Sequence, residues 1–147
     1  MSQPMYHIAA VFIEDDEGRL VLQLRDDKQG IAYPGYWGTW GGRVEDGESP
    51  LEAAVREVFE ELTLNAPMEA LHFFTSTELE SPTRTWHVFF WRAGMLTKGA
   101  IVNEGQRLGR FHLREVAAGT LEGRPVHPVI LRLLDDFCAW REQCRAA

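Results

Sequence analysis

Three glutamates in one short segment carry the strongest chemical signal in this sequence. Glu57, Glu60 and Glu61 are spaced three residues and one residue apart. In a helix these positions fall within a stripe about 100° wide, so their carboxylates repel each other unless something compensates the charge. One interpretation is a solvated acidic helix face. The other is a site for a hard divalent cation, because Mg²⁺ prefers carboxylate oxygens and keeps waters and substrate phosphates as further ligands.

The segment that holds these acids is predicted to be a helix over residues 50–62. Ser49 is a suitable N-cap, Pro50 fits the first helical position, and Glu52 completes a capping box. The apolar positions that recur at helical spacing are Leu51, Ala54, Val55, Val58 and Leu62. The acids border this apolar stripe rather than lying opposite it, which favours a site beside the core over a fully solvated face.

A glycine-rich turn leads into this helix. Residues 41–48 read Gly-Gly-Arg-Val-Glu-Asp-Gly-Glu, and glycine allows both positive φ and a close approach of the backbone to an ion. Counted from Gly42, five residues precede Glu48, and seven more precede the run Arg-Glu-Val-Phe-Glu-Glu-Leu-Thr-Leu at 56–64. This pattern resembles the signature of the Nudix hydrolases, G-x5-E-x7-R-E-U-x-E-E-x-G-U, in which U is a bulky aliphatic residue.

Thr63 is the one position at which this segment departs from the signature. The family has glycine there, which suits the left-handed residue that ends a helix, whereas a β-branched residue is disfavoured at positive φ. Either the helix ends differently in this chain or Thr63 adopts a strained conformation. Trp40 is a second departure, because many members have proline before the paired glycines.

The resemblance implies an α+β fold, namely a Nudix-like α/β/α sandwich with a mixed β-sheet between helices. It also implies hydrolysis of a nucleoside diphosphate linked to another moiety, in which water attacks one phosphorus of the pyrophosphate. By matched position, Glu57, Glu60 and Glu61 are the expected ligands of Mg²⁺ or Mn²⁺, with the backbone carbonyl of Gly41 nearby. Such a cation would neutralise the substrate's charge and acidify a bound water.

The resemblance assigns supporting roles to two further residues. Arg56 is expected to brace the carboxylates, and Glu48 to pair with Arg56 or to reach the metal through water. The simpler interpretations are an ordinary surface ion-pair partner for Arg56 and a favourable charge near the helix N-terminus for Glu48.

Glu104 is the next expected catalytic residue. It lies in the predicted loop 99–107, where family members often place an acid that serves as metal ligand or general base. The simpler interpretation is a solvated loop acid. The general base therefore stays open among Glu60, Glu61 and Glu104.

The signals for substrate binding are weaker. Arg25 ends a predicted strand beside loop 26–38, a region that borders the substrate in the family, although an exposed arginine is the simpler interpretation. Trp37 and Trp40 are expected to stack a nucleobase, and Tyr33, Tyr36 and Trp86 are the alternatives, although aromatic side chains more often belong to a core. Arg84 is a candidate contact for a distal phosphate, with a surface charge as the simpler interpretation. The five histidines show no ligand-like grouping and are interpreted as packing or surface residues.

The remaining pattern predicts the elements that position these residues. Strands on both sides of an early helix, followed by a C-terminal helix, indicate a mixed sheet covered by helices. Besides the helix 50–62, the expected elements are a hairpin of strands 5–13 and 20–24, a short extended segment 39–44, strands 69–78 and 85–92 joined by a turn at Ser81-Pro82, a strand 108–112, a helical turn 114–118 and a helix 127–141.

Length and composition predict one domain over residues 1–147, with 45% hydrophobic and 25% charged residues. The net charge of −7 argues against a nucleic-acid polymer or an anionic membrane as partner, because both attract cationic surfaces. Residues 45–61 hold seven acids and one base, so this segment alone contributes −6. The absence of a signal peptide, a membrane span and a disulfide framework predicts a cytoplasmic protein.

Taken together, the sequence predicts a divalent-metal-dependent pyrophosphohydrolase of a small-molecule nucleotide. A nucleoside triphosphate, including an oxidised one, is the first expected substrate, and a nucleotide sugar or ADP-ribose is the alternative. A module that senses a nucleotide without cleaving it is the rival class, but the three intact glutamates argue against it. A homodimer is compatible with the family, with no interface indicated by the sequence.

Overall fold

A seven-stranded mixed sheet forms the middle layer of this protein. The computed structural model describes residues 6–79 and 84–146. The elements in chain order are β1 (Tyr6–Asp15), β2 (Leu20–Leu24), β3 (Trp37–Gly38), β4 (Trp40–Arg43), α1 (Pro50–Leu62), η1 (Met68–Ala70), β5 (Leu71–Leu79), β6 (Arg84–Gly94), η2 (Met95–Gly99), β7 (Arg107–Phe111), α2 (Leu113–Val116), β8 (Thr120–Leu121), β9 (Arg124–Pro125) and α3 (Pro128–Ala146).

Strand β1 organises the sheet because other strands pair along both of its edges. One edge runs parallel to β6. The other edge is shared, since β4 pairs antiparallel with Ile8–Val11 and β2 pairs antiparallel with Ile13 and Glu14. Strand β3 pairs with β2 instead, so the chain passes from pairing with β2 to pairing with β1 across the single residue, Thr39, between β3 and β4. This crossing brings the glycine-rich turn next to the start of β1.

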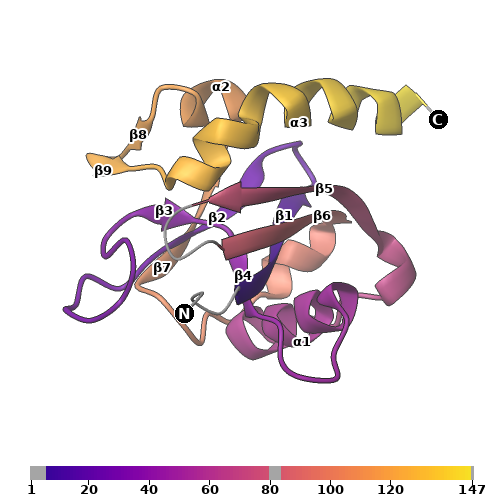
Figure 1. Cartoon of the computed structure of the whole chain (residues 1–147). Helices are drawn as coiled ribbons and strands as arrows, with labels where there is room; N and C mark the ends of the chain where they lie inside the picture. Colours follow the sequence, from indigo (N-terminus) through magenta and orange to yellow (C-terminus); the bar gives the residue numbers. More distant parts are fainter. Residues whose placement is uncertain (1–5, 80–83, 147) are drawn as a thin grey trace.

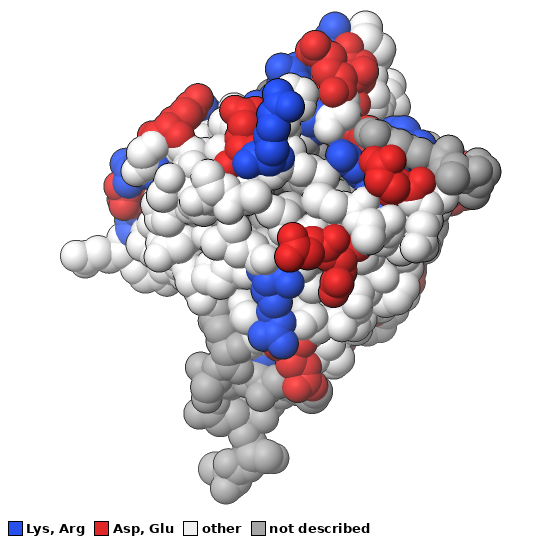
Figure 2. All heavy atoms as spheres, turned by 90° about the horizontal axis from the view of Figure 1, so that it is seen from above, with Lys and Arg blue, Asp and Glu red and all other residues white. Residues whose placement is uncertain are grey.

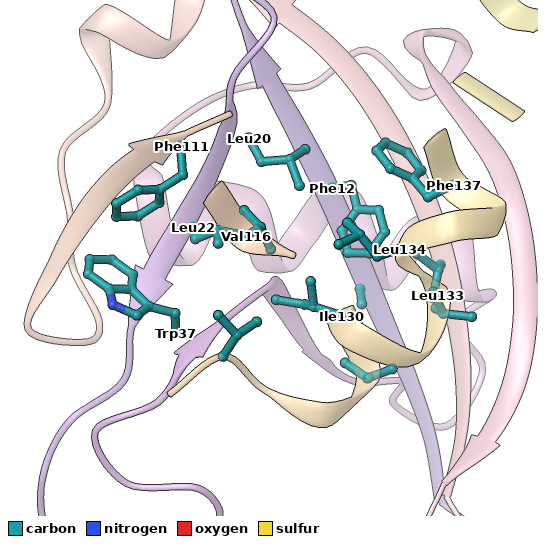
Figure 3. Packing of buried hydrophobic residues seen from close by; sticks show 14 of the residues in the cluster. Phe12, Leu20, Leu22, Trp37, Phe111, Val116, Ile130, Leu133, Leu134 and Phe137 are labelled. Carbon is teal, nitrogen blue, oxygen red and sulfur yellow. The ribbon is translucent and has the colours of Figure 1, made fainter. Parts of the chain in front are cut away.

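Helices cover both faces of the sheet, with α1 on one side and α2 and α3 on the other (Figure 1). Because successive side chains of a strand point to opposite faces, β1 contributes to both layers. Its residues Ala10 and Phe12 pack with α3, whereas Val11 and Ile13 pack with α1. The α3 layer is rich in aromatic residues, and Phe12 meets Phe137 edge to face with ring centroids 4.7 Å apart (Figure 3).

Helix α1 has the predicted bounds and the predicted cap. The Ser49 hydroxyl accepts a hydrogen bond from the Glu52 N–H at 3.1 Å, and the Ser49 N–H donates to the Glu52 carboxylate at 3.0 Å. With helices on both faces of a mixed sheet, the predicted α/β/α sandwich is confirmed.

The C-terminal end of α1 distinguishes between the two endings predicted for it. Thr63 is the C-cap and adopts φ 59° and ψ 32°, the left-handed conformation that the family's glycine would favour. The helix therefore ends in the usual way, and Thr63 adopts the conformation that a β-branched residue disfavours.

Other elements differ from the prediction mainly in their bounds. Helix α3 extends beyond the predicted residue 141, and β7 begins one residue earlier than expected. The short elements η1, η2, β3, β8 and β9 were not predicted, because two to five residues carry too little periodicity. The predicted turn at Ser81-Pro82 lies outside the described residues. Among the helices that the structure describes, none has the length and apolar character needed to cross a membrane.

Candidate functional site

Three carboxylates from two segments that are distant in the chain meet beside strand β4. Glu57 and Glu61 lie on α1, and Glu104 lies on the loop between η2 and β7. One carboxylate oxygen from each of the three lies within 4.8 Å of the other two. Glu61 is buried, Glu57 is partly buried and Glu104 is exposed. The group therefore runs from the core to the surface and has the oxygen donors that a hard cation prefers.

Two glycines let the backbone approach this group closely. Gly41 has φ 139°, and a Cβ there would lie 2.0 Å from the carbonyl oxygen of Ala9. A Cβ on Gly42 would lie 2.6 Å from the carboxylate of Glu57. Any larger residue at either position would displace the strand pairing or the acid, which gives a physical reason for both glycines of the motif.

Glu61 is an acid in a place that disfavours its charge. Its side chain is nearly fully buried, and its carboxylate accepts a hydrogen bond from the Gly41 N–H at 2.7 Å. Burial is the main cause that raises its pKa to about 9, and the nearby negative charges of Glu104 and Glu57 act in the same direction. Burial likewise raises the pKa of Glu57, although the guanidinium of Arg56 opposes the shift. In the absence of a cation, the surroundings of Glu61 therefore favour the protonated form of its carboxyl group.

Arg56 connects the acids on the outer side of α1. Its guanidinium donates to Glu48 at 2.8 and 2.9 Å, to Glu57 at 2.9 Å and to Glu60 at 3.3 Å. These hydrogen bonds lower the pKa of Glu48 to about 2, and the same partners raise the pKa of Arg56. The structure thus brings Glu48 and Arg56 together in the predicted pairing.

Glu60 occupies a different environment from the other two predicted ligands. Its side chain is 55% exposed and forms an ion pair with Arg56. It does not belong to the group formed by Glu57, Glu61 and Glu104 among the described residues. Residues separated by one position thus differ in burial, because α1 turns one of them toward the sheet and the other toward solvent.

A cavity of about 350 Å³ adjoins the acid group. Gly41, Glu57 and Glu104 line it, and so does Arg25. Residues from loop 26–38, the start of β6 and the position just before α3 also line it: Ala32, Tyr33, Arg84, Trp86 and His127. The cavity therefore brings acids, cations and aromatic side chains together.

Trp37 and Trp40 do not line this cavity, so their predicted role in stacking a base does not fit the structure. Both side chains are fully buried. The indole N–H of Trp37 donates to the Leu121 carbonyl at 2.9 Å, and that of Trp40 donates to the Val21 carbonyl at 2.9 Å. Trp37 lies in the α3 layer beside Phe111 (Figure 3). Their side chains fill the two core layers and leave no face for a ligand.

One residue that lines the cavity, His127, carries no motif and was not predicted as a site residue. His127 lies 64 residues beyond Thr63, near which the signature segment ends. Its ring nevertheless packs on Tyr33, with ring centroids 4.2 Å apart. Burial, together with the positive charges of Arg25 and Arg84, lowers the pKa of His127 to about 4. Two other histidines are neighbours across the sheet: His7 Nδ1 and His87 Nε2 lie 2.9 Å apart. Neither grouping leaves a spacing pattern in the sequence, because strand pairing and loop folding produce both.

Charge is distributed unevenly over the molecule. On the face that α3 covers, seen from above in Figure 2, basic and acidic side chains alternate without a large patch of one sign. By contrast, Glu57, Glu61 and Glu104 gather at one point, where the described residues include one direct cationic partner, Arg56 on Glu57. The acid group is therefore a local concentration of negative charge.

The fold and the acid group match a known class of protein. Residues 5–132 match the family model for the NUDIX domain, so the chain belongs to this family. Among solved structures, it is similar to the E. coli ORF135 protein, with 29% identity, a TM-score of 0.70 and coverage of 95% of this chain and 93% of that one. A MutT protein from Methanosarcina mazei Go1 shares the fold at a TM-score of 0.76, with 17% identity and coverage of 96% and 98%.

A shorter likeness concerns a characterised relative. The dihydroneopterin triphosphate diphosphatase of Escherichia coli (strain K12) is 36% identical over 69 residues, which cover 47% of this chain. The match spans only 42% of that relative's own length. This likeness supports the family assignment over about half of the chain.

Proposed function

We propose that this chain is a divalent-metal-dependent pyrophosphohydrolase and that a nucleoside triphosphate, including an oxidised one, is its first expected substrate. One observation carries the proposal: the carboxylates of Glu57, Glu61 and Glu104 converge, and two of them, Glu57 and Glu104, line a cavity whose wall also bears arginines. Membership of the NUDIX domain family supports the reaction class. The proposal treats residues 1–147 as one domain.

The donor set fits Mg²⁺ or Mn²⁺. All three donors are carboxylates, the ligand type that these cations prefer. The raised pKa of Glu61 also indicates that burial and the neighbouring acids disfavour its charged form, which a bound cation would stabilise. Bound there, the cation supplies charge neutralisation and a more acidic water. Glu60 and the backbone carbonyl of Gly41 are proposed as additional ligands, by matched position in the family signature.

The chain's own residues divide the remaining work. Arg56 holds the carboxylate of Glu57 at 2.9 Å, and Glu48 in turn fixes the guanidinium of Arg56. Among the acids considered as general base, the geometry favours Glu104 because its side chain is exposed at the edge of the cavity. Glu61 is buried on Gly41, and Glu60 is paired with Arg56.

The cavity supports a nucleotide-sized substrate. Small-molecule sites have volumes of about 300–1,000 Å³, and this one has about 350 Å³. Arg25, Arg43 and Arg84 lie along its wall, where guanidinium groups suit phosphate oxygens. Trp86 and Tyr33 also line it and provide apolar surface for a base. We propose that the phosphates lie toward the acids and the base toward Tyr33 and Trp86.

A substrate panel tests this proposal. The purified protein is incubated with Mg²⁺ and, separately, with nucleoside triphosphates, their oxidised forms, ADP-ribose, nucleotide sugars and dihydroneopterin triphosphate, the last suggested by the relative's name. We expect hydrolysis of at least one pyrophosphate into two phosphorylated products, assigned by phosphorus NMR. Hydrolysis in heavy-oxygen water identifies which phosphorus is attacked, because the label enters only that product.

Glu57→Gln is the matched control for this experiment. It preserves the size of the side chain and its hydrogen bond to Arg56 but removes the charge, so we expect no hydrolysis by this variant. Tight nucleotide binding by the wild type without turnover of any substrate would instead support a nucleotide sensor.

A further inference from the structure

The loop that carries Glu104 is tied to the end of helix α1. The last carbonyls of a helix have no partner within it. Here, three of them accept hydrogen bonds from the loop: the Leu62 carbonyl from the Ile101 N–H at 2.9 Å, and the Glu61 carbonyl from the Asn103 N–H at 2.8 Å. The side-chain amide of Asn103 donates to the third, the carbonyl of Glu60, at 3.1 Å.

Thr63 adds a contact that the family's glycine could not make. The side-chain amide of Asn103 also donates to the Thr63 hydroxyl at 2.7 Å. Thr63 has φ 59°, a conformation that glycine adopts without strain. Glycine has no hydroxyl, however. This position therefore combines a backbone that favours glycine with a side chain that binds the loop.

The other end of the same loop is fixed to strand β2. The carbonyl of Glu104 accepts a hydrogen bond from the Gln23 side-chain amide at 3.1 Å, and the Gln106 N–H donates to the Leu24 carbonyl at 2.8 Å. Gly105 between them has no room for a Cβ, which would lie 2.8 Å from the Gln23 side chain. Glu104 is thus held between α1 and β2, although its own side chain is exposed.

We propose that Thr63 and Asn103 form a latch that positions the carboxylate of Glu104 on the metal site. When all three carboxylates are ionised, as metal binding requires, they repel each other within 4.8 Å, and Glu104 is the one that lies on a loop rather than on α1. The latch holds this loop against that repulsion through the same helix that carries Glu57 and Glu61. Thr63 and Asn103 are positioning residues. This inference rests on the proposed role of Glu104 at the metal.

Binding of Mn²⁺, followed by electron paramagnetic resonance, tests the latch without a substrate. We expect Asn103→Ala to weaken Mn²⁺ binding about tenfold, as is typical when a residue that orients a metal ligand is removed. Asn65→Ala is the matched control, because Asn65 is an exposed asparagine two residues beyond Thr63 and outside the acid group. This control is expected to bind Mn²⁺ as the wild type does.

Two substitutions at Thr63 separate positioning from stability. Thr63→Gly relieves the positive φ and removes the hydroxyl, so we expect a higher unfolding temperature together with weaker Mn²⁺ binding. Thr63→Ser keeps the hydroxyl and is expected to retain wild-type Mn²⁺ binding. A purely structural role predicts that binding follows stability, which is the opposite outcome for Thr63→Gly. In the double variant with Asn103→Ala, the effects on binding should not add.

The outcomes also separate the latch from the proposed function. If the wild type binds Mn²⁺ and Glu57→Gln does not, while Asn103→Ala and Thr63→Gly bind as the wild type does, the latch is wrong and the metal site stands. If neither the wild type nor Glu57→Gln binds Mn²⁺, both proposals are wrong. Loss of binding in Asn103→Ala and Thr63→Gly, with retention in Thr63→Ser and Asn65→Ala, supports the latch.

Discussion

Two polar side chains, buried on opposite faces of the sheet, differ in their hydrogen-bond partners and in the charges around them. His127, 4% exposed on the α3 side, stays neutral, and its Nδ1 accepts a hydrogen bond from the Val129 N–H at 3.0 Å. Glu61, 2% exposed on the α1 side, has one backbone donor and two neighbouring acids. On the α3 side a buried polar group is satisfied without charge. On the α1 side, a buried acid lies beside two further acids, and a bound cation would offset their combined negative charge.

The two layers around these residues differ in the same sense. The α3 layer packs aromatic rings of Phe12, Phe74, Phe90 and Trp140 around Phe137, each at 4.7–6.2 Å between centroids. The α1 layer is built mostly from smaller apolar residues and includes the helix that bears the acids. This contrast assigns most of the stability to one face and the chemistry to the other. The following experiments would break or sharpen it.

The largest effect is expected from Glu61→Gln. If the proposed function is correct, hydrolysis should fall about a thousandfold, equivalent to about 4 kcal/mol, because a metal ligand is lost. The unfolding temperature of the metal-free protein should stay the same or rise. The pKa of Glu61 is raised to about 9, so the neutral amide resembles the protonated acid of the wild type at neutral pH. Turnover rates and thermal unfolding measure the two effects, and a large loss of stability would contradict the contrast.

On the opposite face, Phe137→Ala should destabilise the protein by about 3–5 kcal/mol, since it removes the ring at the centre of the aromatic layer. Chemical denaturation gives this free energy of unfolding. Under conditions in which the variant is folded, its affinity for Mn²⁺ should equal that of the wild type. A change in Mn²⁺ affinity would show that the two layers are coupled.

His127 should make stability depend on pH. Its pKa is about 4 in the folded protein and about 6.5 when unfolded, so between these values the unfolded state binds more protons. The contribution is therefore fully present above about pH 6.5 and is lost as the pH falls toward 4, by up to about 3 kcal/mol. The free energy of unfolding, measured across this pH range, should change less steeply with pH in His127→Gln than in the wild type. The exposed His72 offers the control, because His72→Gln should keep the wild-type slope.

The smallest effect is expected from Trp37→Phe. An aromatic ring is retained, but the Leu121 carbonyl loses its indole donor and the smaller ring fills less of the core, which together should cost about 2 kcal/mol of stability. The KM for any substrate should not change, because Trp37 is buried away from the cavity. A marked rise in KM without a loss of stability would restore Trp37 as a substrate-binding residue.

Local sequence was sufficient to predict helix α1 and the acids that it carries. The cap at Ser49, the apolar stripe and the acids on α1 all depend on residues within one or two turns of each other, so helical periodicity determines which face each occupies. A close approach of the backbone at the paired glycines was equally predictable from the sequence, and the structure shows that larger residues would not fit there. The pairing of Glu48 with Arg56 follows from the same short segment.

Only the tertiary structure decided the rest of the site. Glu104 joins Glu57 because the chain returns to the end of α1 after two further strands, and sequence spacing does not encode that return. The sequence could not show that Trp37 and Trp40 lie in the core, since the same side chain can stack a base or fill a layer. The burial of a side chain and its distance from other site residues depend on how layers pack between segments that are far apart in the chain. The candidate catalytic groups, by contrast, could be recognised from their residue types and local periodicity.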